Sequence, residues 1–364
     1  MTCNICNNKK YIVILDKGKI PIWTGSPQKK NYYKCQLRQC VKCGHVYQEV
    51  LSDLSTILKN IYKSNNAQVS TPLGTGNWGL ERAKIYLSRI NYKKHKSAIE
   101  LGCANGFILK FLEDFGYDTL IGIEPSLSIS KQIGNIKFIK SFANEKTSLG
   151  LKVDLIFSNC VFEHIGNING ILKFIRKHLN ASGELFFTVP NAQRELEDGD
   201  ISLFLHEHIN YFTKNAINFV LSKNRFQVNY IKEDTSVLYV SAKLIDKNYT
   251  KLKQPKLYNN FSDSMNNKIS EFENIIISKK KIILHGVCNK LNNIFGWSKK
   301  KISFTLVDND EIKVGKIFFG KKVLSINDIN LSKYDNVVIV PTSYYKDIKK
   351  QYIDLGFKGK FYHV

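Results

Sequence analysis

The sequence lacks the features of several large protein classes. No apolar run approaches the roughly 18–20 residues of a membrane-spanning helix, and the first six residues lack the basic-then-apolar order of a secretory signal. Hydrophobic residues at 43% and charged residues at 23% exclude a mainly disordered chain. A length of 364 residues suffices for two or three domains. We therefore expect a soluble, cytoplasmic protein with a sizeable core.

Arginine is also scarce. Only six of the 54 basic residues are arginine, although arginine is best suited to bidentate phosphate and base contacts. Lysine is spread along the chain and forms no single tract. The net charge of +23 therefore indicates a solvated basic surface more than a nucleic-acid partner. Nothing in the sequence sets an oligomeric state.

Cysteine is rare except at the amino terminus, where five of the eight cysteines lie within 43 residues. Two CxxC turns brought together form a tetrahedral sulfur site, which suits Zn²⁺. A closed four-sulfur site has no open position, so we expect the metal to stabilise a segment with little core of its own. Reduced, unliganded cysteines or a redox CxxC pair are the alternative. The predicted ligands are Cys3, Cys6, Cys40 and Cys43, with Cys35 and His45 as spares.

Alternating strand and helix patterns indicate parallel βαβ units in the middle of the chain. The predicted strands cover residues 97–100, 120–123, 136–139, 153–157 and 184–189, with a helix over 107–115. A bridging helix over 269–277 leads to further strands at 281–286, 302–307 and 336–340. We expect an α/β protein with a zinc-binding domain over 1–66, a Rossmann-like domain over 67–240, a linker with the bridging helix over 241–280, and a smaller Rossmann-like domain over 281–364.

An acid and two glycines follow the first of the central strands. Gly102 and Gly106 allow the backbone to turn closely past a ligand, and the helix that follows directs its amino terminus toward that ligand. The spacing does not match the GxGxxG dinucleotide fingerprint. A second acid, Glu124, ends the next strand, where a carboxylate can accept both hydroxyls of a ribose.

This order of Glu100, glycine turn and second acid resembles the class I S-adenosylmethionine (SAM) methyltransferases. The resemblance implies SAM as cofactor, with Glu100 and Gly102 at its methionine end and Glu124 at its ribose. Phe142 matches the region that covers adenine, and Asn159 matches the methionine pocket. A nucleotide-binding α/β domain without methyl transfer is the alternative. The implied cofactor residues are Glu100, Gly102, Cys103, Ala104, Gly106, Glu124, Phe142 and Asn159.

Two histidines flank a glutamate beyond the fifth strand, in the string His206-Glu207-His208. A neutral imidazole can remove a proton from a substrate near pH 7, and Glu207 could orient it. Two histidines this close cannot share one helical face, so one would point into a cleft and the other away. The spacing does not match the HExxH arrangement of a metal site. A satisfied structural histidine is the alternative.

The whole chain resembles the deoxysugar C-methyltransferases, which act on nucleotide-linked keto-sugars. The resemblance rests on the cysteine spacing, the glycine turn and the string from Glu207 to Phe212. It implies that His208 is the base, that Glu207 is its neighbour and that His164 is a second active-site histidine. It makes the carboxy-terminal domain one wall of the substrate cleft, where Lys290 and the lysines at 299–301 either meet a diphosphate or are only surface charge.

The function expected from the sequence is methylation of a small molecule, a nucleotide-linked keto-sugar, in surface polysaccharide or glycoside synthesis. An O- or N-methyltransferase acting on another small molecule is the alternative within the same class. A zinc-ribbon protein whose SAM domain modifies RNA is a further alternative, which the zinc site and net charge would suit and the low arginine content opposes.

Overall fold

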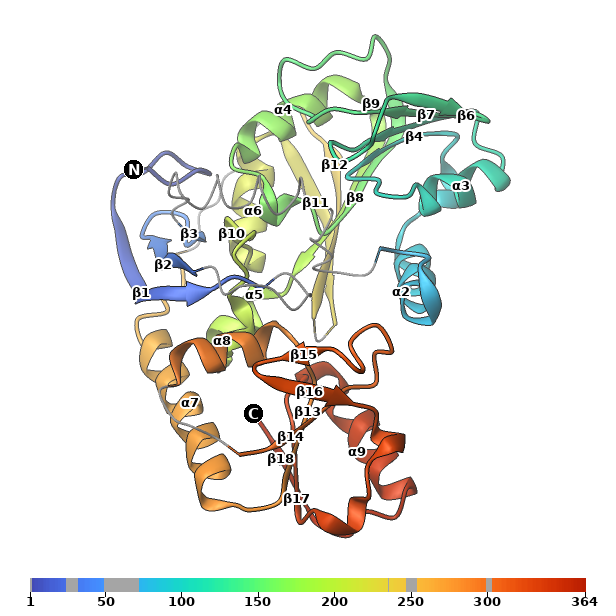
Figure 1. Cartoon of the computed structure of the whole chain (residues 1–364). Coiled ribbons are helices and arrows are strands. Elements are labelled where there is room, and N and C mark those ends of the chain that lie inside the picture. The colour runs from blue at the N-terminus through green and yellow to red at the C-terminus, as the bar shows by residue number, and fades with distance from the viewer. Residues whose placement is uncertain (1, 24–31, 49–71, 235, 247–253, 299–302) are drawn as a thin grey trace.

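The computed structural model describes residues 2–23, 32–48, 72–234, 236–246, 254–298 and 303–364. Its strands form three sheets (Figure 1). The amino-terminal strands lie against both the central part of the chain and its carboxy-terminal part, as the blue, green and orange-to-red ribbons of Figure 1 show. No helix in the described ranges is long and apolar enough to cross a membrane.

The amino-terminal sheet has four strands in the order β1-β2-β3-β10. Its first three strands are β1 (Tyr11–Pro21), β2 (Tyr32–Cys40) and β3 (Val46–Gln48). Alternate residues of β2 are buried, which is the pattern of a strand with one covered face. The fourth strand, β10 (Asn210–Tyr211), comes from the middle of the chain and pairs antiparallel with β3. The segment that follows His208 is therefore part of the amino-terminal sheet.

The central sheet has eight strands in the order β11-β12-β9-β8-β4-β5-β7-β6. Five are parallel and confirm the predicted strands: β4 (Ser97–Leu101), β5 (Thr119–Ile123), β7 (Ile136–Ile139), β8 (Val153–Asn159) and β9 (Leu179–Pro190). Antiparallel pairing adds β11 (Phe226–Glu233) and β12 (Val237–Leu244) at one edge and β6 (Lys131–Ile133) at the other. Strand β12 continues past residue 240, the expected end of this domain.

The strand order reverses beside β4, since the chain adds β5 and β7 on one side and β8 and β9 on the other. In open α/β sheets, ligands bind outside the carboxyl ends of the strands at such a reversal. Helix α3 (Phe107–Asp114) leaves the end of β4, as predicted, and buries Ile108, Leu109 and Leu112. The other helices of this part are α2 (Gly76–Arg89), α4 (Ile168–His178), α5 (Ala192–Asp198) and α6 (Lys214–Lys223).

The carboxy-terminal sheet has six strands in the order β15-β16-β14-β13-β17-β18. They are β13 (Ile282–His285), β14 (Thr305–Val307), β15 (Ile317–Phe318), β16 (Lys321–Leu324), β17 (Asn336–Ile339) and β18 (Lys360–His363). The helices are α7 (Phe261–Ser278), α8 (Asn289–Trp297) and α9 (Tyr345–Asp354). Helix α7 begins earlier than predicted because Phe261 and Met265 extend its buried face by two turns.

One hydrophobic core joins all three parts of the chain. It contains Leu37 of β2, Phe204 of the central part, Phe272 of α7 and Leu291 of α8, all of them fully buried. Asn293 of α8 donates hydrogen bonds to the backbone carbonyls of Ile201 and Phe204. The three parts therefore form a packed unit.

A buried ion pair reinforces this packing and corrects one expectation. Lys290 is 4% exposed, and its Nζ lies 3.3 Å from a carboxylate oxygen of Asp200. It also donates to Thr342 Oγ1 at 3.0 Å and to the backbone carbonyl of Val364. Burial would raise the pKa of Asp200, but the charge of Lys290 and the hydrogen bonds from Ser202 lower it. The Lys290 ammonium group therefore binds internal partners and is not available to bind a diphosphate. The lysines at 299–301 lie outside the described residues.

We expect Lys290→Met to lower the free energy of unfolding by about 3–5 kcal/mol, because it leaves the buried Asp200 carboxylate without its cation. The double variant Asp200→Leu/Lys290→Met removes both charges and should recover most of that loss. Urea unfolding of the three proteins at pH 7 measures both effects. A single-variant loss no larger than that of the double variant would show that the ion pair does not hold the parts together.

Candidate functional site

The glycine turn lies where β4 ends, at the reversal of strand order. Gly102 and Gly106 have φ values of +70° and +75°, which L side chains rarely adopt. A Cβ on Gly102 would lie 2.5 Å from Cγ2 of Val161, and one on Gly106 would lie 2.6 Å from Cζ of Phe138. The turn therefore requires glycine at both positions, for conformation and for space.

The carboxylate of Glu124 fixes this turn to the end of β5. One of its oxygens accepts a hydrogen bond from the backbone N–H of Ala104 at 3.2 Å, and the other accepts from Ser126 at 2.9 Å. Ala104 itself has a positive φ of 45°, a strained conformation for a residue with a side chain. Glu124 thus holds the turn in place and keeps lone pairs for a ligand, since each carboxylate oxygen can accept more than one hydrogen bond.

Glu100 is a buried acid with one unsatisfied carboxylate oxygen. It is 4% exposed, and its Oε2 has no hydrogen-bond partner among the described residues. Burial, and next the charge of Glu124, raises the pKa of Glu100 well above its ordinary value. Buried polar atoms are normally satisfied by protein, water or ligand. The site is therefore suited to a ligand that brings a positively charged donor to the end of β4.

The remaining predicted cofactor residues occupy three different settings. The Cys103 sulfur packs in the core, since a Cβ on the neighbouring Gly122 would lie 2.6 Å from it. Only the Cys103 backbone can border the turn. Asn159 ends β8 and accepts a hydrogen bond from Thr188 Oγ1 at 2.9 Å. The Phe142 side chain is 74% exposed, so its role over adenine stays a prediction.

The histidines meet just beyond the end of β8. His164 belongs to a short 3-10 turn (Phe162–His164), and its Nδ1 lies 3.1 Å from the backbone oxygen of Glu207. Because a carbonyl only accepts, this Nδ1 carries a proton. The ring centroids of His164 and His208 are 5.1 Å apart. The fold thus brings together two histidines that the sequence separates by more than 40 residues.

Burial sets the protonation of His208. Burial, and next the charges of His164 and His206, lowers the pKa of His208 well below its ordinary value, so its imidazole is neutral at pH 7. His206 is 2% exposed and packs against the ring of Tyr33. Its Nε2 lies 3.4 Å from Glu207, whose other carboxylate oxygen lies 3.9 Å from Nδ1 of His164. One histidine of the HEH string is thus internal, and the other joins the cluster.

The sequence analysis missed Glu163. This acid is fully buried, and burial raises its pKa to about 7 although the His164 charge opposes the shift. Its ligand atoms and those of His164 and His208 lie within 4.8 Å of one another. The acid beside His164 was visible in the sequence, but its spatial neighbour His208 was not. Glu163, His164 and His208 can exchange protons or hold a cation.

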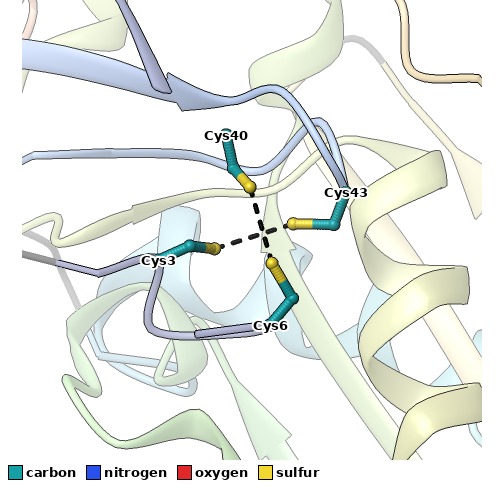
Figure 2. A group of neighbouring side chains, drawn as sticks. All are labelled: Cys3, Cys6, Cys40 and Cys43. Atoms are coloured by element: carbon teal, nitrogen blue, oxygen red, sulfur yellow. Dashed lines mark hydrogen bonds between the residues drawn. The ribbon is translucent and has the colours of Figure 1, made fainter. Parts of the chain in front are cut away.

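The four predicted cysteines form a cluster in which all sulfurs point to a common centre (Figure 2). The Sγ atoms of Cys3 and Cys43 are 3.6 Å apart, and those of Cys6 and Cys40 are 3.5 Å apart. Tetrahedral Zn²⁺ with Zn–S bonds of about 2.3 Å requires sulfurs about 3.8 Å apart. The four cysteines therefore fit this ion.

The two spare ligands are used elsewhere. Cys35 is buried in the hydrophobic core shared by the three parts of the chain. His45 Nε2 lies 3.0 Å from the side-chain oxygen of Asn210. Burial lowers the pKa of His45 to about 4, so the ring is neutral. Neither side chain belongs to the sulfur cluster.

Comparison with known proteins identifies the central part of the chain. Residues 80–230 match a family described as "Methyltransferase domain", which confirms that the central part of the chain is a methyltransferase domain. Residues 278–360 match a family described as "C2185-like, N-terminal". No curated protein matches the chain.

Several solved structures resemble about half of the chain weakly. A SAM-dependent methyltransferase from Mesorhizobium loti is 12% identical with a TM-score of 0.40, and the match covers 46% of this chain and 100% of that one. The N-methyltransferase NodS from Bradyrhizobium japonicum, in complex with S-adenosylhomocysteine (SAH), is 15% identical with a TM-score of 0.39, covering 51% and 98%.

We expect Glu100→Gln to stabilise the ligand-free protein at neutral pH. Because the pKa of Glu100 is raised in the folded state, folding at neutral pH must either protonate this carboxylate or bury its charge. Either route lowers the free energy of unfolding by about 1.4 kcal/mol for each unit of pKa difference between the two states. This cost develops as the pH rises above the ordinary value of glutamate and is absent below about pH 4, where both states are protonated. Urea unfolding of both proteins at pH 4 and pH 7.5 measures the difference.

The control is Glu124→Gln, which is isosteric and lies beside the same turn. It replaces one of two accepting oxygens by an amide donor, so it should destabilise the protein by about 1–3 kcal/mol. Equal effects of the two variants would contradict the assignment of Glu100 as the unsatisfied acid.

Proposed function

We propose that this methyltransferase binds SAM across the carboxyl ends of β4 and β5 and methylates a nucleotide-linked keto-sugar that His208 deprotonates. The observation that carries the proposal is the buried carboxyl of Glu100, whose Oε2 has no hydrogen-bond partner among the described residues. It lies beside the glycine turn that Glu124 holds. The neutral His208 lies with His164 beyond the neighbouring strand, β8.

The cofactor residues have complementary tasks. Glu100 would accept hydrogen bonds from the ammonium group of the methionine end, which would also favour its ionised form. Glu124 would accept hydrogen bonds from the ribose hydroxyls with the lone pairs that Ala104 and Ser126 leave free. When bound, SAM supplies a methyl group already activated by its sulfonium. The protein then has to orient the acceptor and exclude water.

The acceptor must lose a proton before or during attack, and His208 is suited to take it. A base has to be unprotonated, and burial keeps His208 in that state at pH 7. His164 donates its Nδ1 proton to the Glu207 carbonyl, which fixes the orientation of the ring against His208. With a ketone beside the acceptor carbon, proton removal gives an enolate. With a hydroxyl acceptor, the same base would act on oxygen.

The nucleotide-sugar acceptor is supported by the resemblance of the whole chain to the deoxysugar C-methyltransferases. It is also consistent with a basic protein, since the net charge of +23 favours approach of an anionic substrate. Lys290 is excluded from diphosphate binding by its buried contacts with Asp200 and Thr342. Such acceptors serve surface polysaccharide or glycoside synthesis, which we propose as the setting of the reaction.

We further propose that the four cysteines hold Zn²⁺ in a structural site. Their sulfurs converge as a tetrahedral ion requires, and all four ligand positions are protein thiolates. No position then remains for a substrate. The ion would stabilise the two turns that carry the cysteines.

The proposed function is tested with labelled SAM and a panel of nucleotide-linked sugars with and without a keto group. We expect transfer to keto forms, and we expect His208→Asn to lower the rate about 10²- to 10⁴-fold without weakening binding of SAH, measured by calorimetry. His95→Asn, at the opposite end of β4, is the control and should keep the full rate. No heat with SAH would overturn the cofactor site, and transfer to hydroxyl sugars alone would overturn the enolate route.

We expect elemental analysis to find one zinc ion per chain. Cys40→Ser/Cys43→Ser should abolish zinc binding, because two remaining thiolates cannot complete a tetrahedral site. Cys35→Ser is the matched control, since Cys35 lies outside the cluster and should leave the metal content unchanged. Zinc retained in the double variant would show that other residues bind it.

A further inference from the structure

Asn210 connects the sulfur cluster to the active-site histidines. It is 1% exposed and lies two residues after His208, at the start of β10. Its Nδ2 donates to the backbone oxygens of Phe162 at 3.0 Å and Ile165 at 2.8 Å. Its Oδ1 lies 2.5 Å from Nδ2 of Asn4 and 3.0 Å from Nε2 of His45. The side-chain amide thus makes four hydrogen bonds.

The orientation of this amide is set by chemistry. The backbone oxygens of Phe162 and Ile165 can only accept hydrogen bonds, so the amide nitrogen must face them. The oxygen then faces Asn4 and His45, which both donate. A side-chain amide has two donor hydrogens and two acceptor lone pairs, so Asn210 uses its full capacity.

The partners of Asn210 come from three separate segments. Asn4 lies between Cys3 and Cys6, and His45 lies two residues after Cys43, so each cysteine turn supplies one donor. The accepting oxygens, of Phe162 and Ile165, flank the Glu163-His164 pair on either side. Both cysteine turns and the active-site turn therefore meet at one side chain.

Backbone hydrogen bonds also join the segment around Asn210 to the amino-terminal sheet and to the turn that carries His164. Strand β10 pairs with β3, with Asn210 opposite Tyr47. Gln48 donates its backbone N–H to Ile209 at 3.0 Å and its side chain to the His206 oxygen at 3.1 Å. The Ile209 N–H in turn donates to the Glu163 oxygen at 2.8 Å. The loop that carries His208 thus lies between the amino-terminal sheet and the turn that carries His164.

We propose that Asn210 is a positioning residue through which the four-cysteine centre sets the placement of His164 relative to His208. A fully satisfied buried polar network specifies one arrangement, whereas a partly satisfied one is costly. Ordering of the cysteine turns by the metal therefore holds Asn4 and His45 toward the amide, and the amide holds the turn at 162–165. The proposal rests on the proposed function for the roles of the two histidines and of the metal.

The test uses Asn210→Asp in the zinc-loaded, full-length protein. The carboxylate keeps the shape of the side chain and the acceptors for Asn4 and His45, but it loses both donors to the turn at 162–165. We expect the amides of His164 and Ile165, which are hydrogen-bonded within that turn, to exchange hydrogen about tenfold faster or more. Zinc content and SAH affinity should be unchanged. Hydrogen exchange followed by mass spectrometry reads the turn directly and needs no acceptor substrate.

The matched control is Asn336→Asp. Asn336 is also buried and donates its side-chain N–H to a backbone oxygen, that of Lys280, in the carboxy-terminal part. It should leave exchange at 162–165 at the wild-type rate. Removal of zinc by a chelator should accelerate exchange at 162–165 in the wild type and add little in Asn210→Asp. Wild-type exchange in Asn210→Asp, or no effect of the chelator on this turn in the wild type, would overturn the proposal.

A second variant covers the case in which Asn210→Asp does not fold. His45→Phe keeps a ring of similar size and removes only one donor to Asn210, on the side of the cysteine turns. It should also accelerate exchange at 162–165, and wild-type exchange there would contradict the coupling. Failure of the proposed function is a separate result, because it appears as absent SAH binding or as full activity of His208→Asn, neither of which depends on exchange at this turn.

Discussion

The hydrogen bond from the backbone N–H of Ala104, in the glycine turn, to the carboxylate of Glu124 holds the candidate site together. It fixes the glycine turn at the end of β4 against the end of β5. Parallel strands end at one edge of a sheet, and the reversal of order beside β4 opens that edge. Around this turn lie the buried carboxyl of Glu100, the end of β8 and the turn with His164.

The protein also depends on sharing structure between parts of the chain. The amino-terminal sheet takes its last strand from the central part, and one hydrophobic core includes residues from all three parts. The buried pair of Lys290 and Asp200 then joins α8 to the segment that precedes the HEH string. The loop with His208 is therefore supported from two sides, by the amino-terminal sheet and by the carboxy-terminal part.

Local sequence patterns predicted the features of the structure that depend on residues close together in the chain. The apolar runs of the parallel strands, the glycine turn and the CxxC spacing depend on neighbours within a few residues, and the structure shows all three features. The early start of α7 was missed because Phe261 and Met265 are isolated apolar residues in a polar stretch. Strand β10 has only two residues and gives no periodic signal.

The long-range contacts were beyond sequence reasoning for a physical reason. Burial raises the pKa of Glu163. Lys290 forms an ion pair with Asp200, which lies 90 residues away in the sequence. Asn210 lies within the string that carried the family resemblance, but its partners are at residues 4, 45, 162 and 165. Such roles become visible only when the chain is folded.

The pairing of β10 with β3 limits how this architecture can vary. When one part of a chain supplies a strand to the sheet of another part, the two paired segments must remain compatible, because each must keep an edge that pairs with the other. Exchange of the amino-terminal segment between related enzymes would therefore have to carry the loop around His208 with it. The cysteine-bearing segment and the loop around His208 should therefore change together as related chains diverge.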